Sequence, residues 1–176
     1  MKTCRKLMEE GTPTSFATDG AGIASIISVI DDSAAPAQAL TTSTQDAWQR
    51  VIWRDLAGLL LNADLTQITW NYNGSSVSGG VTVGGWSWNT ATRWQLTAHG
   101  GSDLYGPGAS YYFGRTTSTF SNTFFCGGNL VQTFYYNNDM WGHPNGTATR
   151  SQNSDTVNEC LPVHIDIQSA YGKWPG

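Results

Sequence analysis

The chain has 176 residues, enough for one domain of ordinary size, and a net charge of −4. Only 12% of its residues are charged, about half of the usual quarter, so no basic surface is present that would attract nucleic acid. Its eight Trp, seven Tyr and six Phe exclude a disordered polar chain, and no apolar run reaches the roughly 18 residues that suggest a membrane-spanning segment.

Residues 1–39 are predicted to be a secretory leader or a disordered tail. Basic residues near the start are followed by the apolar run 21–30 and by the small-residue pattern Ala-Pro-Ala-Gln-Ala at 35–39. Acidic residues on both sides of the apolar run favour the tail. If the pattern is a leader, the protein is secreted and residues 40–176 form the mature, single β-rich domain.

The segment from Ser43 to Leu61 is predicted to form one N-terminal helix that docks on the rest of the domain. Its apolar residues recur at steps of three and four, which is the pattern of a helical stripe, and Ser43 or Thr44 could cap the start. A strand over residues 48–53 is the alternative, because bulky side chains crowd that stretch.

From Leu65 onward the pattern is that of strands. Residues 67–72 alternate between apolar and polar and lead into Asn73-Gly74, a strong hairpin signal that Asn145-Gly146 repeats. Both pairs also fit the acceptor pattern for glycosylation, but a turn explains them fully. About eight short strands predict a mainly β fold, a single antiparallel β-sandwich that is jelly-roll-like or barrel-like.

Three cysteines are present, and Cys4 lies in the expected leader. Its removal leaves Cys126 and Cys160, which are predicted to form a disulfide in an oxidising compartment. Two buried free thiols are the alternative. No Cys-x-x-Cys spacing exists, so neither a metal site nor any other cofactor is expected.

The candidate catalytic residues are weak. His99, Asp103, Asp139 and His143 lie in or beside expected loops, where sites are common, and they could serve an extracellular hydrolase. No nucleophile elbow and no phosphate-binding loop accompany them. Catalysis is therefore left open, with a non-enzymatic role preferred.

Aromatic residues are more informative. Trp86, Trp88, Tyr105 and Trp141 lie in or beside segments rich in glycine and asparagine, and we predict that they form a ligand-binding surface. Flat aromatic faces suit sugar rings, and Tyr and Trp are also enriched at protein interfaces. The alternative is that these residues belong to an aromatic core.

Together these features favour a secreted binding module for a glycan or an extracellular protein, either alone or as a subunit of a secreted assembly. The extracellular hydrolase is one alternative. A secreted toxin or pore-forming protein is another, because the Thr- and Ser-rich segments 115–122 and 147–158 could form amphipathic hairpins.

Overall fold

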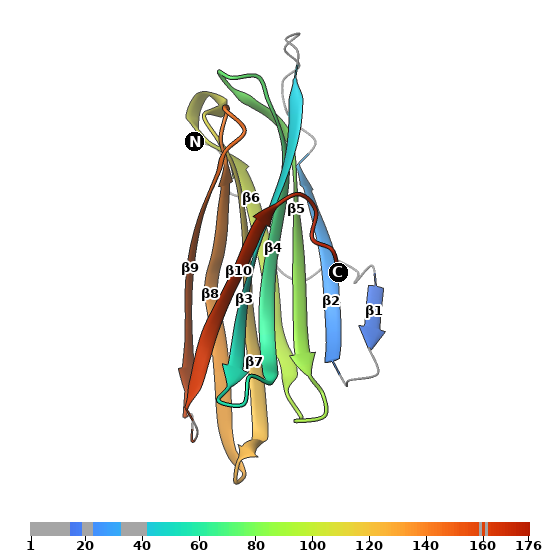
Figure 1. The fold of residues 1–176 in the computed structure, drawn as a ribbon, viewed down its shortest axis with the longest axis vertical. Helices are drawn as coiled ribbons and strands as arrows, with labels where there is room; N and C mark the ends of the chain where they lie inside the picture. Colours follow the sequence, from blue (N-terminus) through green and yellow to red (C-terminus); the bar gives the residue numbers. More distant parts are fainter. Residues whose placement is uncertain (1–14, 19–22, 33–41, 159, 161) are drawn as a thin grey trace.

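The computed structural model describes residues 15–18, 23–32, 42–158, 160 and 162–176, and this part of the chain is built almost entirely of β-strands (Figure 1). The strands of one sheet are β1 (Ser15–Thr18), β2 (Ile23–Asp32), β3 (Ser43–Asp55), β4 (Leu60–Tyr72), β5 (Val77–Asn89) and β10 (Val163–Tyr171). Those of the other are β6 (Gln95–Tyr105), β7 (Tyr112–Cys126), β8 (Asn129–Gly142) and β9 (Ala148–Val157), and a short 3-10 turn, η1 (Pro107–Ala109), precedes β7.

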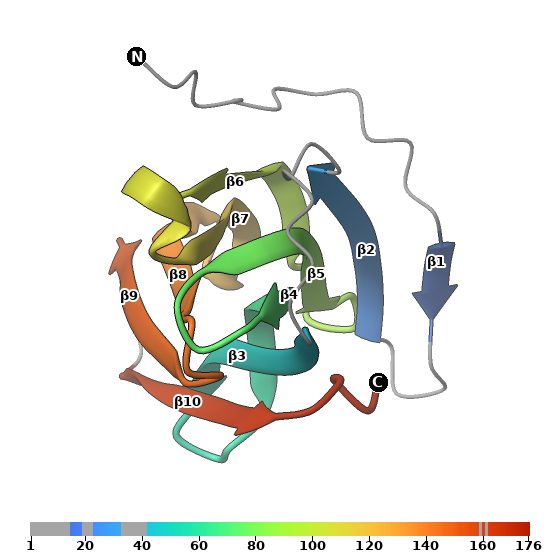
Figure 2. The same cartoon turned by 90° about the horizontal axis from the view of Figure 1, so that it is seen from above.

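The two sheets are antiparallel and lie face to face, so the predicted mainly β sandwich is confirmed in outline. The six-stranded sheet has the order β1-β2-β5-β4-β3-β10, and the four-stranded sheet has the order β6-β7-β8-β9. Figure 2 shows from above how β3 to β10 follow one another around a shared core. Within each sheet most neighbours are consecutive in the chain, which makes two meanders rather than the crossed connections of a jelly roll.

The predicted helix over residues 43–61 is wrong, because this segment forms β3, a turn and the start of β4. The strand alternative, residues 48–53, lies within β3. Val51 on the inner face and Ile52 on the outer face are both fully buried. A strand buried on both faces loses its two-residue alternation, so its apolar residues can imitate a helical stripe. Leu56 and Leu59, which extended the stripe, are exposed in the turn.

The predicted leader lies partly outside the described residues, since residues 1–14, 19–22 and 33–41 are not described. Most of its apolar run falls in β2, whose backbone pairs with β5 from Ile23–Asn89 to Asp32–Gly80. Cleavage after residue 39 remains a prediction. It would remove β2 and leave β5 at the edge of its sheet.

Two apolar clusters fill the space between the sheets and are separated by a buried polar layer. The cluster near the disulfide contains Val51, Trp53, Leu61, Trp86, Trp88, Trp94, Phe120, Cys126, Val131 and Tyr135. The cluster near the two Asn-Gly turns contains Ala47, Ile68, Trp70, Val77, Tyr112 and Met140. We call these ends of the sandwich the disulfide end and the hairpin end.

Glycine lets the sheets approach closely at the hairpin end. Gly142 on β8 lies against the indole of Trp70, and Gly114 on β7 lies against Ile68 and Thr82. A Cβ atom at either glycine would overlap these side chains. The glycines therefore make room for the large aromatic residues of the core.

Candidate functional site

A shallow hollow lies on the four-stranded sheet, at the level where its strands lose register. The pairing shifts between Leu96 and Ala98, between Thr116 and Ser118, and between Tyr135 and Asn137. An extra residue in one strand bends that strand and re-aims its side chains. The hollow has a volume of about 270 Å³, and its lining residues are Ala98, His99, Thr117, Ser118, Thr119, Phe134, Tyr135 and Tyr136.

Two aromatic rings form a flat wall of this hollow. Tyr135 points into the core, so Phe134 before it and Tyr136 after it lie on the outer face of the sheet. Their ring centroids are 5.7 Å apart and the ring planes differ by only 4°. Tyr136 is 51% exposed, which leaves a flat apolar surface open to a ligand.

An ion pair continues the same face toward the hairpin end. Arg115 on β7 donates from Nε and Nη2 to the two carboxylate oxygens of Asp139 on β8, at 2.6 and 2.7 Å. Its guanidinium carbon also lies 5.4 Å from the centroid of the Phe113 ring, and that ring lies 5.2 Å from the ring of Trp141. We call this row the outer strip; its members are Phe113, Arg115, Phe134, Tyr136, Asp139 and Trp141.

The structure divides the four predicted ligand-binding aromatics between the core and the surface. Trp86 and Trp88 are buried in the apolar cluster at the disulfide end. Tyr105 is half-buried, with its ring centroid 5.3 Å from that of Tyr112. Trp141 alone among the four belongs to the outer strip.

A buried carboxylate lies between the sheets and anchors the strands beneath the hollow. Asp64 on β4 accepts hydrogen bonds from Trp86 Nε1 at 2.9 Å, Ser118 Oγ at 2.6 Å and Asn138 Nδ2 at 3.0 Å, and also from the hydroxyl of Thr116. Burial raises the pKa of the Asp64 carboxyl, and these hydrogen bonds oppose the rise. Since both oxygens are saturated and inaccessible, Asp64 orders the core and is not available to a ligand.

The candidate catalytic residues are engaged in separate contacts. The ring of His99 lies 4.4 Å from that of Trp86, and burial against it lowers the pKa of the imidazole. Asp103 accepts the hydroxyl of Tyr112 at 2.9 Å inside the sandwich, whereas Asp139 lies on the outer face.

His143 lies beyond β8 and shares a 2.9 Å hydrogen bond with Thr149 Oγ1. Among the described residues, no three His, Cys, Asp or Glu side chains are grouped so that they could hold a metal ion.

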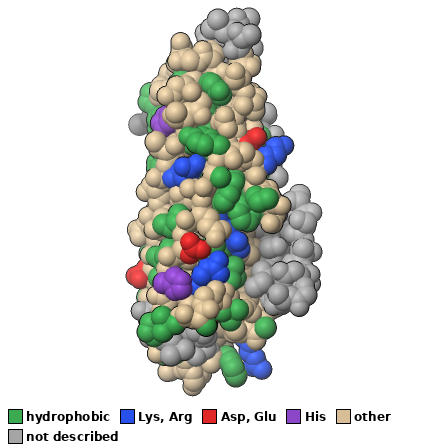
Figure 3. Space-filling view, viewed as in Figure 1, with side chains coloured by type: hydrophobic (Ala, Val, Ile, Leu, Met, Phe, Trp, Pro, Cys, Tyr) green, Lys and Arg blue, Asp and Glu red, His purple; other side chains and the backbone are tan. Residues whose placement is uncertain are grey.

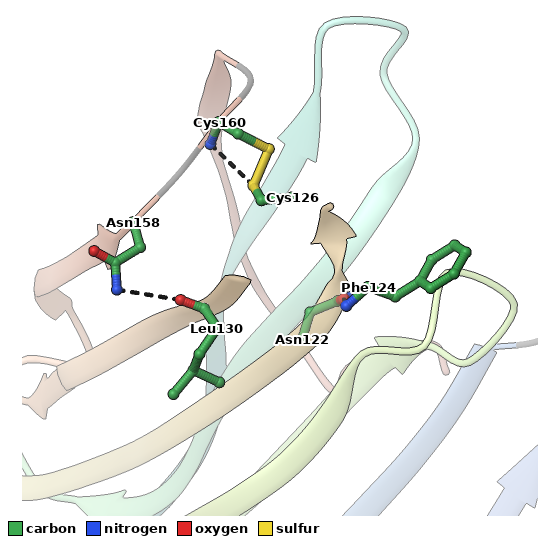
Figure 4. Close-up of a disulfide and its surroundings, with 6 residues drawn as sticks. All are labelled: Asn122, Phe124, Cys126, Leu130, Asn158 and Cys160. Carbon is green, nitrogen blue, oxygen red and sulfur yellow. Dashed lines mark hydrogen bonds between the residues drawn. A yellow bond between two sulfur atoms is a disulfide. The ribbon is translucent and has the colours of Figure 1, made fainter. Parts of the chain in front are cut away.

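The predicted disulfide is confirmed, and Cys126 and Cys160 join the end of β7 to the connection between β9 and β10 (Figure 4). The Cys160 N–H donates to Cys126 Sγ at 3.1 Å, and Asn158 Nδ2 donates to the carbonyl of Leu130 at 3.2 Å. In the described part of the chain, no helix has the length and apolar character needed to cross a membrane.

Sequence reasoning did not single out Phe134 and Arg115 as members of a surface site. The usable signal is the alternation in Phe134-Tyr135-Tyr136, which places the first and third rings on the same face of a strand. The sequence does not show which face is buried, and the register shift at Tyr136 follows from no motif.

Comparisons of the chain with protein-family models, with curated proteins and with solved structures found no significant match. The outer strip and the hollow beside it are therefore the features of the molecule that bear on its function.

Proposed function

We propose that the protein is an extracellular binding module that holds a glycan on the outer face of the four-stranded sheet. The observation that carries this proposal is the half-exposed ring of Tyr136, parallel to Phe134, at the wall of a hollow. The apolar C–H face of a sugar ring stacks on such a surface. The hydroxyls of Thr117 and Thr119, which also line the hollow, supply hydrogen bonds to the sugar.

The charge of the outer strip favours a neutral ligand. Arg115 is the one cation of the outer strip, and its bidentate contact with Asp139 neutralises the charge and fixes the orientation of the guanidinium group. Asn137 Nδ2 also donates to Asp139, at 3.1 Å. A neutral polysaccharide matches this face better than a sulfated or phosphorylated one.

Export of the protein is part of the same proposal. A disulfide is typical of proteins that fold in an oxidising compartment, and the Cys126–Cys160 bridge supports such a location. The intact mass of protein collected from the medium tests export: a start at Leu40 supports it, and an intact Met1 start in the cytosol contradicts it.

The hydrolase hypothesis receives no support from the contacts of His99, Asp103, Asp139 and His143, which are separate from one another. The Thr- and Ser-rich segments of the toxin hypothesis lie in β7 and in and beside β9, paired within the four-stranded sheet.

The experiment compares Tyr136→Ala with Tyr171→Ala, because each tyrosine is 51% exposed and Tyr171 lies on the other sheet. A glycan array identifies a ligand for the unmodified protein, and titration gives the affinities. Loss of a central aromatic contact is expected to weaken binding by roughly thirtyfold in Tyr136→Ala, at an unchanged melting temperature. Tyr171→Ala should bind as the parent does.

Absence of any retained glycan, or an equal loss in both variants, would contradict the proposal. If the protein instead captures an extracellular protein, and Tyr136→Ala abolishes that capture, the same face binds a protein and the glycan proposal is wrong.

A further inference from the structure

Large apolar side chains are exposed on neighbouring connections at the disulfide end. Leu56 is 74% exposed and Leu59 45% exposed in the turn between β3 and β4. Phe124 is 62% exposed near the end of β7, and Leu130 is 44% exposed at the start of β8. We call these four residues the apolar tip. Exposed apolar groups concentrated at one end of a protein commonly mark an interaction site.

The turn that carries the two leucines is held in shape by hydrogen bonds. The side chain of Asp55 accepts the N–H of Leu59 at 2.8 Å, and its carbonyl accepts the N–H of Gly58 at 3.0 Å. Gly58 has a φ of +82°, which glycine adopts readily and Leu does not. These hydrogen bonds therefore fix the turn in a shape in which the side chain of Leu56 is exposed to solvent.

The aromatic member of the tip is braced as well (Figure 4). The N–H of Phe124 donates to Asn122 Oδ1 at 2.7 Å, and Asn122 Nδ2 donates to the carbonyl of Thr92 at 2.6 Å in the connection between β5 and β6. The guanidinium carbon of Arg93, in the same connection, lies 4.5 Å from the centroid of the Phe124 ring. The disulfide and the Asn158–Leu130 hydrogen bond tie the connection between β9 and β10 to β7 and β8, the strands that carry Phe124 and Leu130.

The area and shape of the tip favour a membrane surface over a folded partner. A fully exposed large side chain offers about 200 Å², so the four residues together offer roughly 450 Å². A stable protein interface needs about 800 Å² from each side. Leu56 and Leu59 lie in the β3–β4 turn, and Phe124 and Leu130 lie on the two sides of the β7–β8 turn, at the same end of the sandwich (Figure 1). A patch of this size is better suited to insertion between lipid headgroups than to a stable protein interface.

Cations at the same end fit the headgroup region of a bilayer. Arg93 lies against Phe124. Arg54 donates to the carbonyl of Gly58 within the leucine turn and also forms an ion pair with Asp166 at 3.4 Å, so its charge is shared with that carboxylate. Long basic side chains next to inserted apolar groups keep their charges at the level of the lipid phosphates. On these grounds we propose that the apolar tip docks the protein on the surface of a lipid bilayer, without crossing it.

The test uses vesicles of phosphatidylcholine, alone and with one-fifth phosphatidylserine, free of glycolipid so that glycan binding does not contribute. The parent protein should co-sediment with both kinds of vesicle. Leu56→Ser and Phe124→Ser should each lower the partition coefficient about tenfold and retain the parent melting temperature, because both side chains are exposed. Ile167→Ser is the matched control, since Ile167 is 50% exposed on β10, outside the tip.

The proposal is overturned if the parent protein stays in the supernatant with both vesicles, or if Ile167→Ser weakens partition as much as the tip variants do. It is also overturned if analytical ultracentrifugation shows a dimer that Phe124→Ser dissociates while vesicle binding is absent. That result would assign the tip to contact between two copies of the chain.

Discussion

Replacing Asp64 by Asn tests whether the buried polar layer depends on a carboxylate. Each oxygen of Asp64 receives two hydrogen bonds, and Asn keeps the shape while exchanging one oxygen for an NH2 group. Hydroxyl donors can rotate to accept from that group, but the N–H of Trp86 or of Asn138 then loses its acceptor. A buried donor without a partner costs about 1–3 kcal/mol, and the loss of charge-assisted bonds adds to this.

Removal of a buried charge offsets part of the cost, so we expect a net loss of about 3 kcal/mol in the free energy of unfolding. For a chain of this size, such a loss lowers the melting temperature by about 10 °C. Urea denaturation with the disulfide intact measures it. Asp155→Asn, at an exposed position on β9, is the control and should change the stability by less than about 0.5 kcal/mol. A cost below about 1 kcal/mol for Asp64→Asn would refute the reasoning.

The cost of Asp64→Asn in the free energy of unfolding is also expected to depend on pH. Burial raises the pKa of Asp64 above its value of about 3.9 in the unfolded chain, so the folded state binds this proton more tightly. The resulting stabilisation is fully present below about pH 4 and is lost as the pH rises through the folded-state pKa. Asn does not titrate, so the cost of Asp64→Asn should be greatest in acid and decline toward neutral pH. A cost that grows with pH would show that the hydrogen bonds outweigh burial.

Two further predictions concern the disulfide and the close approach of the sheets. Cys160→Ser should lower the free energy of unfolding by about 4 kcal/mol, because the bridge closes a loop with a sequence separation of 34; equal denaturation midpoints with and without reductant would contradict this. Gly142→Ala should cost about 1–3 kcal/mol, because its Cβ would overlap the Trp70 ring; an unchanged melting temperature would show that the sheets separate freely there.

The strands and turns of the domain follow from local sequence rules. Asn73-Gly74 lies between β4 and β5, and Asn145-Gly146 between β8 and β9, with positive φ at both glycines. Such turns depend on a few adjacent residues, so a single sequence suffices to find them. The disulfide likewise followed from the number of cysteines left after the expected leader.

The helix failed for a physical reason that lies outside the segment itself. β3 is buried on its inner face by the four-stranded sheet, and Ile52 and Trp48 on its outer face are covered as well. Trp174 packs on Trp48, with ring centroids 4.5 Å apart, and its N–H donates to Gln67. The C-terminal tail, more than a hundred residues away in the chain, thus covers part of the outer face of β3. The strand therefore lacks the exposed polar face by which a half-buried strand is recognised in a sequence.

A similar reason explains why the predicted ligand-binding aromatics are divided between the core and the surface. Alternation correctly groups Trp86 with Trp88, but the face on which they lie is decided by the opposite sheet, where Ser118 and Asn138 meet the same carboxylate as Trp86. The low charge and the aromatic surplus indicated binding, but the sequence did not indicate which rings remain exposed. On the face visible in Figure 3, which includes β3 and β10, most of the surface is apolar or uncharged polar, and a small group of basic, acidic and His side chains lies together in its lower half.

Binding of a glycan in the hollow beside Tyr136 can be observed residue by residue. Titration of isotopically labelled protein with the oligosaccharide selected on the array, followed by amide NMR, tests it directly. We expect the shifted amides to cluster at residues 117–119 and 134–137, with smaller shifts near Trp141. Shifts confined to the six-stranded sheet or to the hairpin end, with residues 117–119 and 134–137 unchanged, would contradict it.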